Sequence, residues 1–184
     1  MQKANLHVVE GGGEPRSAQD AFPATDEALF QRYAPYVARI GLRLLGREAD
    51  VDDLIQEVFL AAFRQRSQVR DPLAFKGWLA IVAVRTARRT LRRRRMRAFV
   101  GLDALAAPLE LRDHTMSPER RALLSRVYQV LDRIPVEQRL AWSLRYVEGE
   151  KLERVAEQCG CSLATAKRRI AAAHARIQGE LIDG

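Results

Sequence analysis

The sequence predicts an all-α fold of two small helical domains joined by a flexible linker. Apolar residues recur every three or four positions along two long stretches, as in amphipathic helices, and no stretch shows the alternation of a strand. Glycine and proline gather before and between these stretches. We therefore expect a disordered tail at residues 1–24, one domain at 25–97, a linker at 98–117 and a second domain at 118–184.

The charge and the hydropathy of the chain indicate which partners it binds and whether it enters a membrane. The chain carries 31 Lys and Arg residues against 23 Asp and Glu residues, a net charge of +8, which favours a polyanionic partner. No apolar run reaches the ~20 residues that cross a bilayer, and the N-terminus lacks the apolar core of a signal peptide. These features indicate a cytoplasmic protein that does not insert into membranes.

The first domain begins with one apolar stripe at helical spacing, formed by Leu29, Tyr33, Val37, Ile40 and Leu44. Pro35 inside this stripe predicts a kink or an interruption, and Gly46 predicts the end of the helix. A second helix follows, with Asp52 and Asp53 favourably placed near its positive end. A loop at residues 66–72 precedes a third helix, in which Trp78 is expected to join the core.

The third helix runs into a strongly basic segment at residues 85–97. Its arginines are Arg85, Arg88, Arg89, Arg92, Arg93, Arg94, Arg95 and Arg97. Like charges three or four positions apart oppose a helix by roughly a few tenths of a kcal/mol per pair, and a bound polyanion relieves that repulsion. Arginine also suits bidentate contacts to phosphate, so nucleic acid is favoured over a solvated basic face or an acidic protein partner.

The second domain is expected to hold four helices, the last two in a helix-turn-helix pattern at residues 152–177. A cap at Ser117 starts the first helix, Gly160 supplies the turn of the pattern, and Ser162 caps the last helix. The first two turns of that last helix, where a recognition helix meets the major groove, carry Lys167, Arg168 and Arg169. A helical hairpin with a solvated basic face would show the same local pattern.

The cysteines and histidines indicate no metal or redox site. Cys159 and Cys161 are one residue apart, so a disulfide between them would be strained, and we expect buried or half-buried thiols. His7, His114 and His174 are too scattered to complete a zinc site. No arrangement typical of a catalytic triad, a carboxylate pair or a phosphate loop is present, so we expect a protein that is not an enzyme and needs no cofactor.

Three segments, in this order and spacing, carry a family resemblance. They are Asp52-Asp53-Leu54-Ile55-Gln56-Glu57-Val58-Phe59, then Phe75-x-x-Trp78-Leu79, and then Leu131-x-x-Ile134-Pro135 followed by the helix-turn-helix. With them, residues from about 25 to 182 resemble the extracytoplasmic-function (ECF) sigma factors of the sigma-70 family, which are promoter-specificity subunits of bacterial RNA polymerase. The resemblance implies a sigma2-like helical domain at 25–97 and a sigma4-like helix-turn-helix domain at 118–184.

The resemblance also implies three binding sites. The polymerase-binding residues would be Asp53, Gln56 and Glu57, on one exposed side of the second helix. The minus-ten promoter element would contact Arg66, Arg70, Arg85, Arg88, Arg89 and Arg92. The minus-thirty-five element would contact Ser162, Thr165, Lys167, Arg168 and Arg169. Arg85 and Arg89 stand where the family often has Asn and Asp, which should strengthen phosphate contact and blur base readout.

The implied function is promoter-specific initiation of transcription, in which the polymerase does the chemistry. The implied partners are core RNA polymerase, promoter DNA and an anti-sigma factor that holds the protein until a stress or envelope signal arrives. Two alternatives remain open on the residues alone. A stand-alone helix-turn-helix transcriptional regulator would bind duplex DNA without polymerase, and an arginine-rich RNA-binding protein would rely on residues 85–97.

Overall fold

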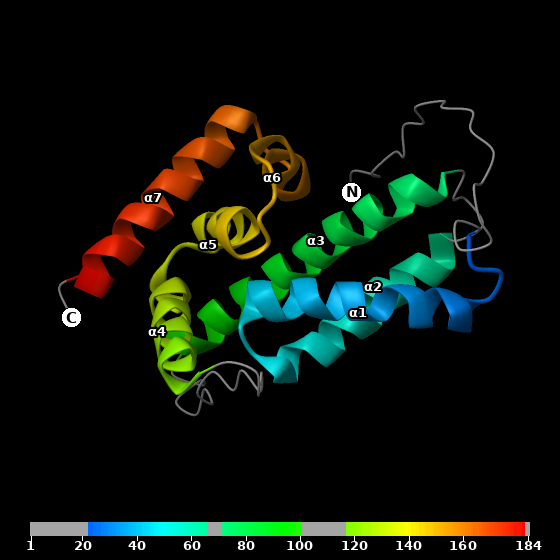
Figure 1. Ribbon diagram of the computed structural model, residues 1–184, viewed down its shortest axis with the longest axis horizontal. Helices are drawn as coiled ribbons and strands as arrows, with labels where there is room; N and C mark the ends of the chain where they lie inside the picture. Colours follow the sequence, from blue (N-terminus) through cyan, green and yellow to red (C-terminus); the bar gives the residue numbers. More distant parts are fainter. Residues whose placement is uncertain (1–21, 66–70, 101–116, 183–184) are drawn as a thin grey trace.

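The computed structural model describes residues 22–65, 71–100 and 117–182, and every regular element in these ranges is helical (Figure 1). The all-α prediction is therefore confirmed. The elements are α1 (Asp26–Leu45), η1 (Glu48–Asp50), α2 (Val51–Gln65), α3 (Pro72–Phe99), α4 (Pro118–Arg133), α5 (Val136–Trp142), the π-helical turn η3 (Ser143–Val147), α6 (Leu152–Cys159) and α7 (Leu163–Ile182). Most of the predicted tail and of the predicted linker lies outside the described residues.

Helix α1 is bounded by two caps and runs unbroken between them. The side chain of Thr25 accepts a hydrogen bond from the backbone N–H of Ala28 at 3.1 Å, and Gly46 ends the helix with a left-handed φ of 68°. Of the kink or interruption expected at Pro35, the interruption is wrong, because the helix continues through this residue, and the kink stays a prediction. Pro35 lies on the exposed side, where water can satisfy the carbonyl group that loses its helical partner.

Helices α1, α2 and α3 pack against one another around an apolar core. The whole predicted stripe of α1 is buried, and its most exposed member, Tyr33, is only 8% exposed. Helices α2 and α3 add the buried side chains Leu54, Val58, Phe59, Phe75 and Leu79. Trp78 is half-buried against this core, stacked on Phe75 with the ring centroids 5.6 Å apart.

The second domain contains the expected helix-turn-helix as α6 and α7. Gly160 ends α6 with a left-handed φ of 62°, and no neighbouring atom fills the space its side chain would need. Ser162 then caps α7, because its hydroxyl oxygen accepts a hydrogen bond from the backbone N–H of Thr165 at 3.2 Å. Ser117 caps α4 in the same way through the N–H of Arg120.

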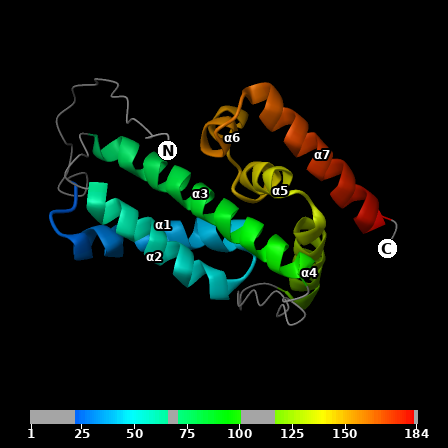
Figure 2. The same ribbon diagram turned by 180° about the vertical axis from the view of Figure 1, so that it is seen from behind.

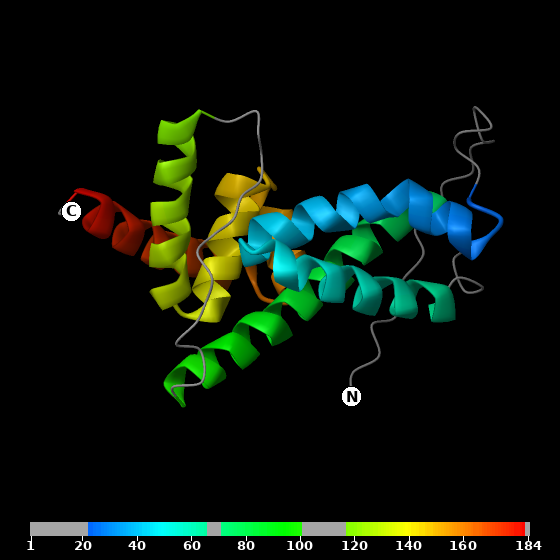
Figure 3. The ribbon, with the colours of Figure 1, turned by 90° about the horizontal axis from the view of Figure 1, so that it is seen from below.

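The two domains are docked against each other along α3. Helices α5 and α6 lie beside α3 in both views of the ribbon (Figures 1 and 2). A single apolar cluster joins α3 residues such as Leu79 and Ala83 to Leu140, Leu144 and Val155 of the second domain. The C-terminal end of α1 points at α5 (Figure 3). The sequence predicted the two helical domains but not this contact between them.

Candidate functional site

The exposed face of α2 carries the three residues expected to bind polymerase. Asp53, Gln56 and Glu57 are all exposed, whereas Leu54 and Val58 are buried against the bundle. This alternation follows from helical spacing, which places residues three and four apart on one side. Two carboxylates and one amide are thus presented together to solvent. The structure brings the set together as the sequence predicted.

Glu57 also joins this face to the basic helix α3. Its carboxylate accepts a hydrogen bond from Nη2 of Arg89 at 2.6 Å, and the same nitrogen lies 3.1 Å from Oγ1 of Thr86. The side chain of Arg89 is 65% exposed, so this ion pair is solvent-screened and contributes about 0–1 kcal/mol to stability. A residue expected to bind polymerase and one expected to bind DNA therefore contact each other.

The remaining minus-ten residues fall on two sides of α3. Arg85 is exposed and lies four positions before Arg89, on the same side of the helix. Arg88 and Arg92 lie on another side and face the second domain. Arg88 donates from Nη2 to the carbonyl oxygen of Cys159 at 2.7 Å, at the end of α6. The two other predicted residues of this set, Arg66 and Arg70, lie outside the described residues.

The predicted minus-thirty-five residues lie along the first turns of α7. Lys167 and Arg168 are exposed, while Thr165 is half-buried beside the capping residue Ser162. Arg169 is half-buried and faces α5 of the same domain, with Nη1 3.7 Å from the carboxylate of Glu137. The side chains of Lys167 and Arg168 are therefore presented to solvent, whereas that of Arg169 is turned toward α5.

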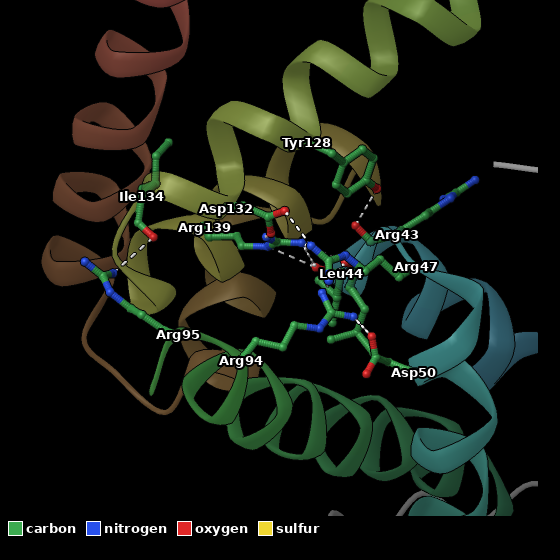
Figure 4. A network of polar contacts seen from close by, with 11 residues as sticks. Arg43, Leu44, Arg47, Asp50, Arg94, Arg95, Tyr128, Asp132, Ile134 and Arg139 are labelled. Carbon is green, nitrogen blue, oxygen red and sulfur yellow. Dashed lines mark hydrogen bonds and ion pairs between the residues drawn. The ribbon is translucent and has the colours of Figure 1, made fainter. Parts of the chain in front are cut away.

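Two arginines of the basic segment bind other parts of the protein itself. Arg94 is 8% exposed, donates to the carbonyl oxygen of Leu45 at 3.0 Å and forms an ion pair with Asp50. Arg95 donates to the carbonyl oxygen of Ile134 at 3.4 Å. Both lie at the contact between the domains (Figure 4). A run of arginines does not reveal which members fold inward, because that depends on long-range partners.

Arg139 is a polar residue at this contact that the sequence analysis did not identify. It is 2% exposed, forms an ion pair with Asp132, and donates hydrogen bonds to the carbonyl oxygens of Leu44 and Leu45 (Figure 4). Burial lowers the pKa of this guanidinium, and Asp132 opposes that effect. In the sequence, the only sign that Arg139 is buried is that it has apolar neighbours in α5.

The cysteines and potential metal ligands do not form a reactive centre in the described residues. Cys159 and Cys161 are both free thiols. Burial raises the pKa of Cys159 to about 11, so its thiol is protonated and weakly nucleophilic near neutral pH. Within residues 22–65, 71–100 and 117–182, no cluster of His, Cys, Asp and Glu could hold a metal ion. No helix in the same ranges is long and apolar enough to span a membrane.

Comparison with known proteins identifies the family. Residues 29–97 match the model of Sigma-70 region 2, and residues 116–177 match that of Sigma-70, region 4. The chain is 32% identical to the ECF RNA polymerase sigma-E factor of Haemophilus influenzae, over 83% of this chain and 85% of that protein. This chain is an ECF sigma factor of the sigma-70 family.

Two other relatives of this sigma factor are also named as RNA polymerase sigma factors. It is 32% identical to the RNA polymerase sigma factor CarQ of Myxococcus xanthus, over 83% of this chain and 84% of that one. It is 30% identical to the probable RNA polymerase sigma factor RfaY of Xanthomonas campestris, over 80% of this chain, but it spans only 38% of that protein. These matches confirm the family resemblance, and a stand-alone regulator is not favoured.

Two solved structures share the fold of this sigma factor. The sigma factor RpoE in complex with the anti-sigma factor NepR from Bartonella quintana superposes with a TM-score of 0.63 at 22% identity, over 84% of this chain and 95% of that one. CnrH in complex with the cytosolic domain of CnrY superposes with a TM-score of 0.58 at 22% identity, over 87% and 91%. At this identity the likeness extends to the fold alone.

Proposed function

We propose that this sigma factor binds core RNA polymerase through the Asp53, Gln56 and Glu57 face of α2 and directs it to promoters through α3 and α7. The observation that carries the proposal is the exposure of Lys167 and Arg168 at the start of α7, in the same chain as the exposed acidic face of α2. Acidic and basic faces of this kind suit a basic protein partner and a DNA duplex respectively.

The minus-ten element is assigned to α3 and the minus-thirty-five element to α7. Arg85 and Arg89 are exposed on one side of α3 and can hold the phosphates of a melted strand. Lys167 and Arg168 lie in the first two turns of a recognition helix, the part that reaches the base edges and phosphates of a major groove. The protein supplies binding and orientation, and the polymerase supplies the chemistry.

An anti-sigma factor is the third proposed partner. One structural neighbour, the sigma factor RpoE of Bartonella quintana, was solved in complex with the anti-sigma factor NepR. An anti-sigma factor that covers the α2 face or the basic surfaces would keep this protein inactive until a stress or envelope signal. We assign the protein to the cytoplasm, where polymerase and promoter DNA are found.

Co-purification with core RNA polymerase tests the proposal. Purified full-length chain is mixed with bacterial core enzyme and passed over a size-exclusion column, with the same chain alone as reference. Co-elution with the core enzyme supports the proposal. Elution of the chain at its free position, in a sample shown by mass spectrometry to contain no inhibitor protein, would overturn it.

A further inference from the structure

A cavity lies between the C-terminal part of α3 and the junction of α4 with α5, where the two domains meet. Its volume is about 160 Å³, and its polar lining consists of one carboxylate, Asp132, and four arginines, Arg47, Arg94, Arg95 and Arg139. An enclosed cavity of about 150 Å³ holds a benzene molecule, so this one has room for one or two phosphate groups. We call the four arginines the cavity arginines. None of them is assigned to polymerase or to promoter DNA.

Two of the cavity arginines are buried and fixed by the backbone. Arg94 and Arg139 are 8% and 2% exposed. Nη1 of Arg94 and Nη2 of Arg139 donate to the same acceptor, the carbonyl oxygen of Leu45, at 3.0 and 2.9 Å (Figure 4). The last carbonyl groups of a helix have no partner within the helix, so they are free to accept these bonds. The end of α1 thus holds both guanidinium groups in place.

The other two cavity arginines are more exposed and lie at the edge of the cavity. The side chain of Arg47 is 25% exposed and donates from Nη2 to Asp132 at 3.4 Å. Arg95 is exposed and donates from Nη1 to the carbonyl oxygen of Ile134, also at 3.4 Å. Both hydrogen bonds are long, and a guanidinium carries five N–H groups. Arg47 and Arg95 can therefore turn further N–H groups toward a ligand in the cavity.

Positive charge is in excess around the cavity. The carboxylate of Asp132 pairs with both Arg47 and Arg139, and that of Asp50 pairs with Arg94. Four guanidinium groups thus share two carboxylates. Burial lowers the pKa of Arg139, Asp132 opposes that effect, and the positive charge of Arg47 adds to the lowering. An anion in the cavity would offset this repulsion, in a space where water screens the attraction less than at the surface.

We propose that this cavity is a binding site for a small phosphate-bearing anion, whose phosphate or diphosphate group is held by the cavity arginines. The planar fork of a guanidinium matches two oxygens of a phosphate group at once. A phosphate group carries about two negative charges near neutral pH, which matches the excess of guanidinium groups over carboxylates. The inference goes beyond the proposed function and does not depend on it.

The rest of the cavity wall is apolar and comes from both domains. Leu91 of α3, Leu131 of α4 and Ile134 are buried, and Val136 of α5 is half-buried. An apolar part of a ligand can lie against this wall while its phosphate groups meet the arginines. The site therefore suits either free pyrophosphate or the diphosphate of a nucleotide. Because its lining comes from both domains, a bound anion strengthens the contact between them.

Calorimetric titration of the full-length chain with inorganic pyrophosphate, at about 0.15 M ionic strength, tests the site. The variant is Arg47→Gln with Arg95→Gln, which removes the two more exposed cavity arginines. The matched control is Arg93→Gln with Arg126→Gln, which changes the net charge equally at exposed positions of α3 and α4. The wild type and the control should bind one pyrophosphate per chain, and the variant should bind at least about tenfold more weakly.

No binding by the wild-type chain, or equal weakening in the two double variants, would overturn the inference. Arg95→Gln alone is a second variant for the case that the double variant does not fold, because this side chain is exposed. It should weaken binding about threefold. Pyrophosphate should also slow backbone hydrogen exchange at residues 43–50 and 131–139. Protection of residues 163–170 in their place would put the anion on α7 and overturn the inference.

Two further probes identify the source of the phosphate. Tighter binding of ADP than of pyrophosphate, weakened in the same double variant, supports the site and indicates a nucleotide. Tighter binding of pyrophosphate supports the site and indicates the free anion. The third probe is a single-stranded DNA oligonucleotide. If the double variant loses affinity for DNA but not for pyrophosphate, Arg47 and Arg95 contact a nucleic acid backbone and the inference fails. Failure of the wild type to co-elute with core polymerase would overturn the proposed function alone.

Discussion

The guanidinium of Arg139 donates two hydrogen bonds to the carbonyl oxygen of Leu44, at 3.1 and 3.2 Å, across the contact between the two domains. Leu44 belongs to the last turn of α1, and Arg139 is the central residue of α5. A residue of the second domain thus completes a helix of the first. This contact makes the relative placement of the domains a specific feature of the fold.

Replacement of Arg139 by methionine should destabilise the protein by about 2–3 kcal/mol. The change removes both arginine hydrogen bonds to the buried carbonyl oxygen of Leu44, leaves that of Leu45 with Arg94 alone, and removes one of the two arginine partners of Asp132. Methionine fills much of the volume. Unfolding by urea measures the effect. The control Arg133→Met removes an arginine that is 74% exposed and should cost no more than about 0.5 kcal/mol. Equal losses in the two variants would contradict the capping role.

The double substitution Asp53→Arg with Gln56→Ala should abolish binding to core polymerase and leave the fold intact. It reverses the charge at the centre of the α2 face, and both side chains point to solvent. Co-elution with core enzyme gives the readout, and circular dichroism verifies the helix content. Glu153→Arg makes the same change in charge on α6 and should bind as the wild type does. Retained affinity in the double variant would remove the docking assignment.

Alanine at Lys167 or at Arg168 should weaken promoter selection without weakening core binding. Each residue is exposed in the first turns of α7, and loss of one base or phosphate contact costs about 1–3 kcal/mol. Binding of the holoenzyme to promoter fragments measures the effect. Lys151→Ala removes an exposed charge that precedes α6 and serves as the control. If the α7 variants lose core binding to the same extent, misfolding explains the result better than a DNA contact does.

The two glycines Gly160 and Gly179 should respond to alanine with opposite signs. Gly160 has a φ of 62°, so alanine there is strained and should cost about 1 kcal/mol, even though no atom obstructs it. Gly179 lies within α7 with open space around it, so alanine should stabilise the helix by up to about 1 kcal/mol. Thermal unfolding of both variants compares them. A gain in stability at Gly160 would show that its left-handed turn is not required.

The thiol of Cys159 should resist alkylation at pH 8 in the native protein, whereas the half-buried Cys161 should react first. Burial raises the pKa of Cys159 to about 11, so the folded state favours the protonated thiol. This contribution to stability is fully present below the unfolded pKa of about 8.5 and is lost as the pH rises through about 11. Mass spectrometry after iodoacetamide treatment, with a urea-unfolded control, identifies the modified residue. Equal rates in the native and unfolded samples would contradict the burial of Cys159.

Local patterns in the sequence were sufficient to predict the main helices and the glycines that end them. The stripe from Leu29 to Leu44 shows which face of α1 is buried, and Gly46 and Gly160 mark turns because few other residues adopt their backbone conformation. Pro35 misled the prediction because its effect depends on which side of the helix it occupies.

The contact between the domains could not be predicted in the same way. An apolar stripe shows that a face is buried but not what covers it, so Leu140 and Val155 gave no sign that they share a cluster with α3. Arg94 and Arg139 have partners 49 and 95 positions away in the sequence, beyond the reach of any local pattern. The ion pairs of Arg88, Arg92 and Arg169 with Glu137 likewise join helices that are far apart in the sequence.

Run-off transcription with core RNA polymerase tests the central claim most directly. The template pool consists of genomic promoter fragments, and core enzyme is assayed with and without the purified chain. The account predicts discrete new start sites that require the chain and disappear with the Asp53→Arg and Gln56→Ala double variant. Transcripts that are identical with and without the chain would contradict its role as a sigma factor.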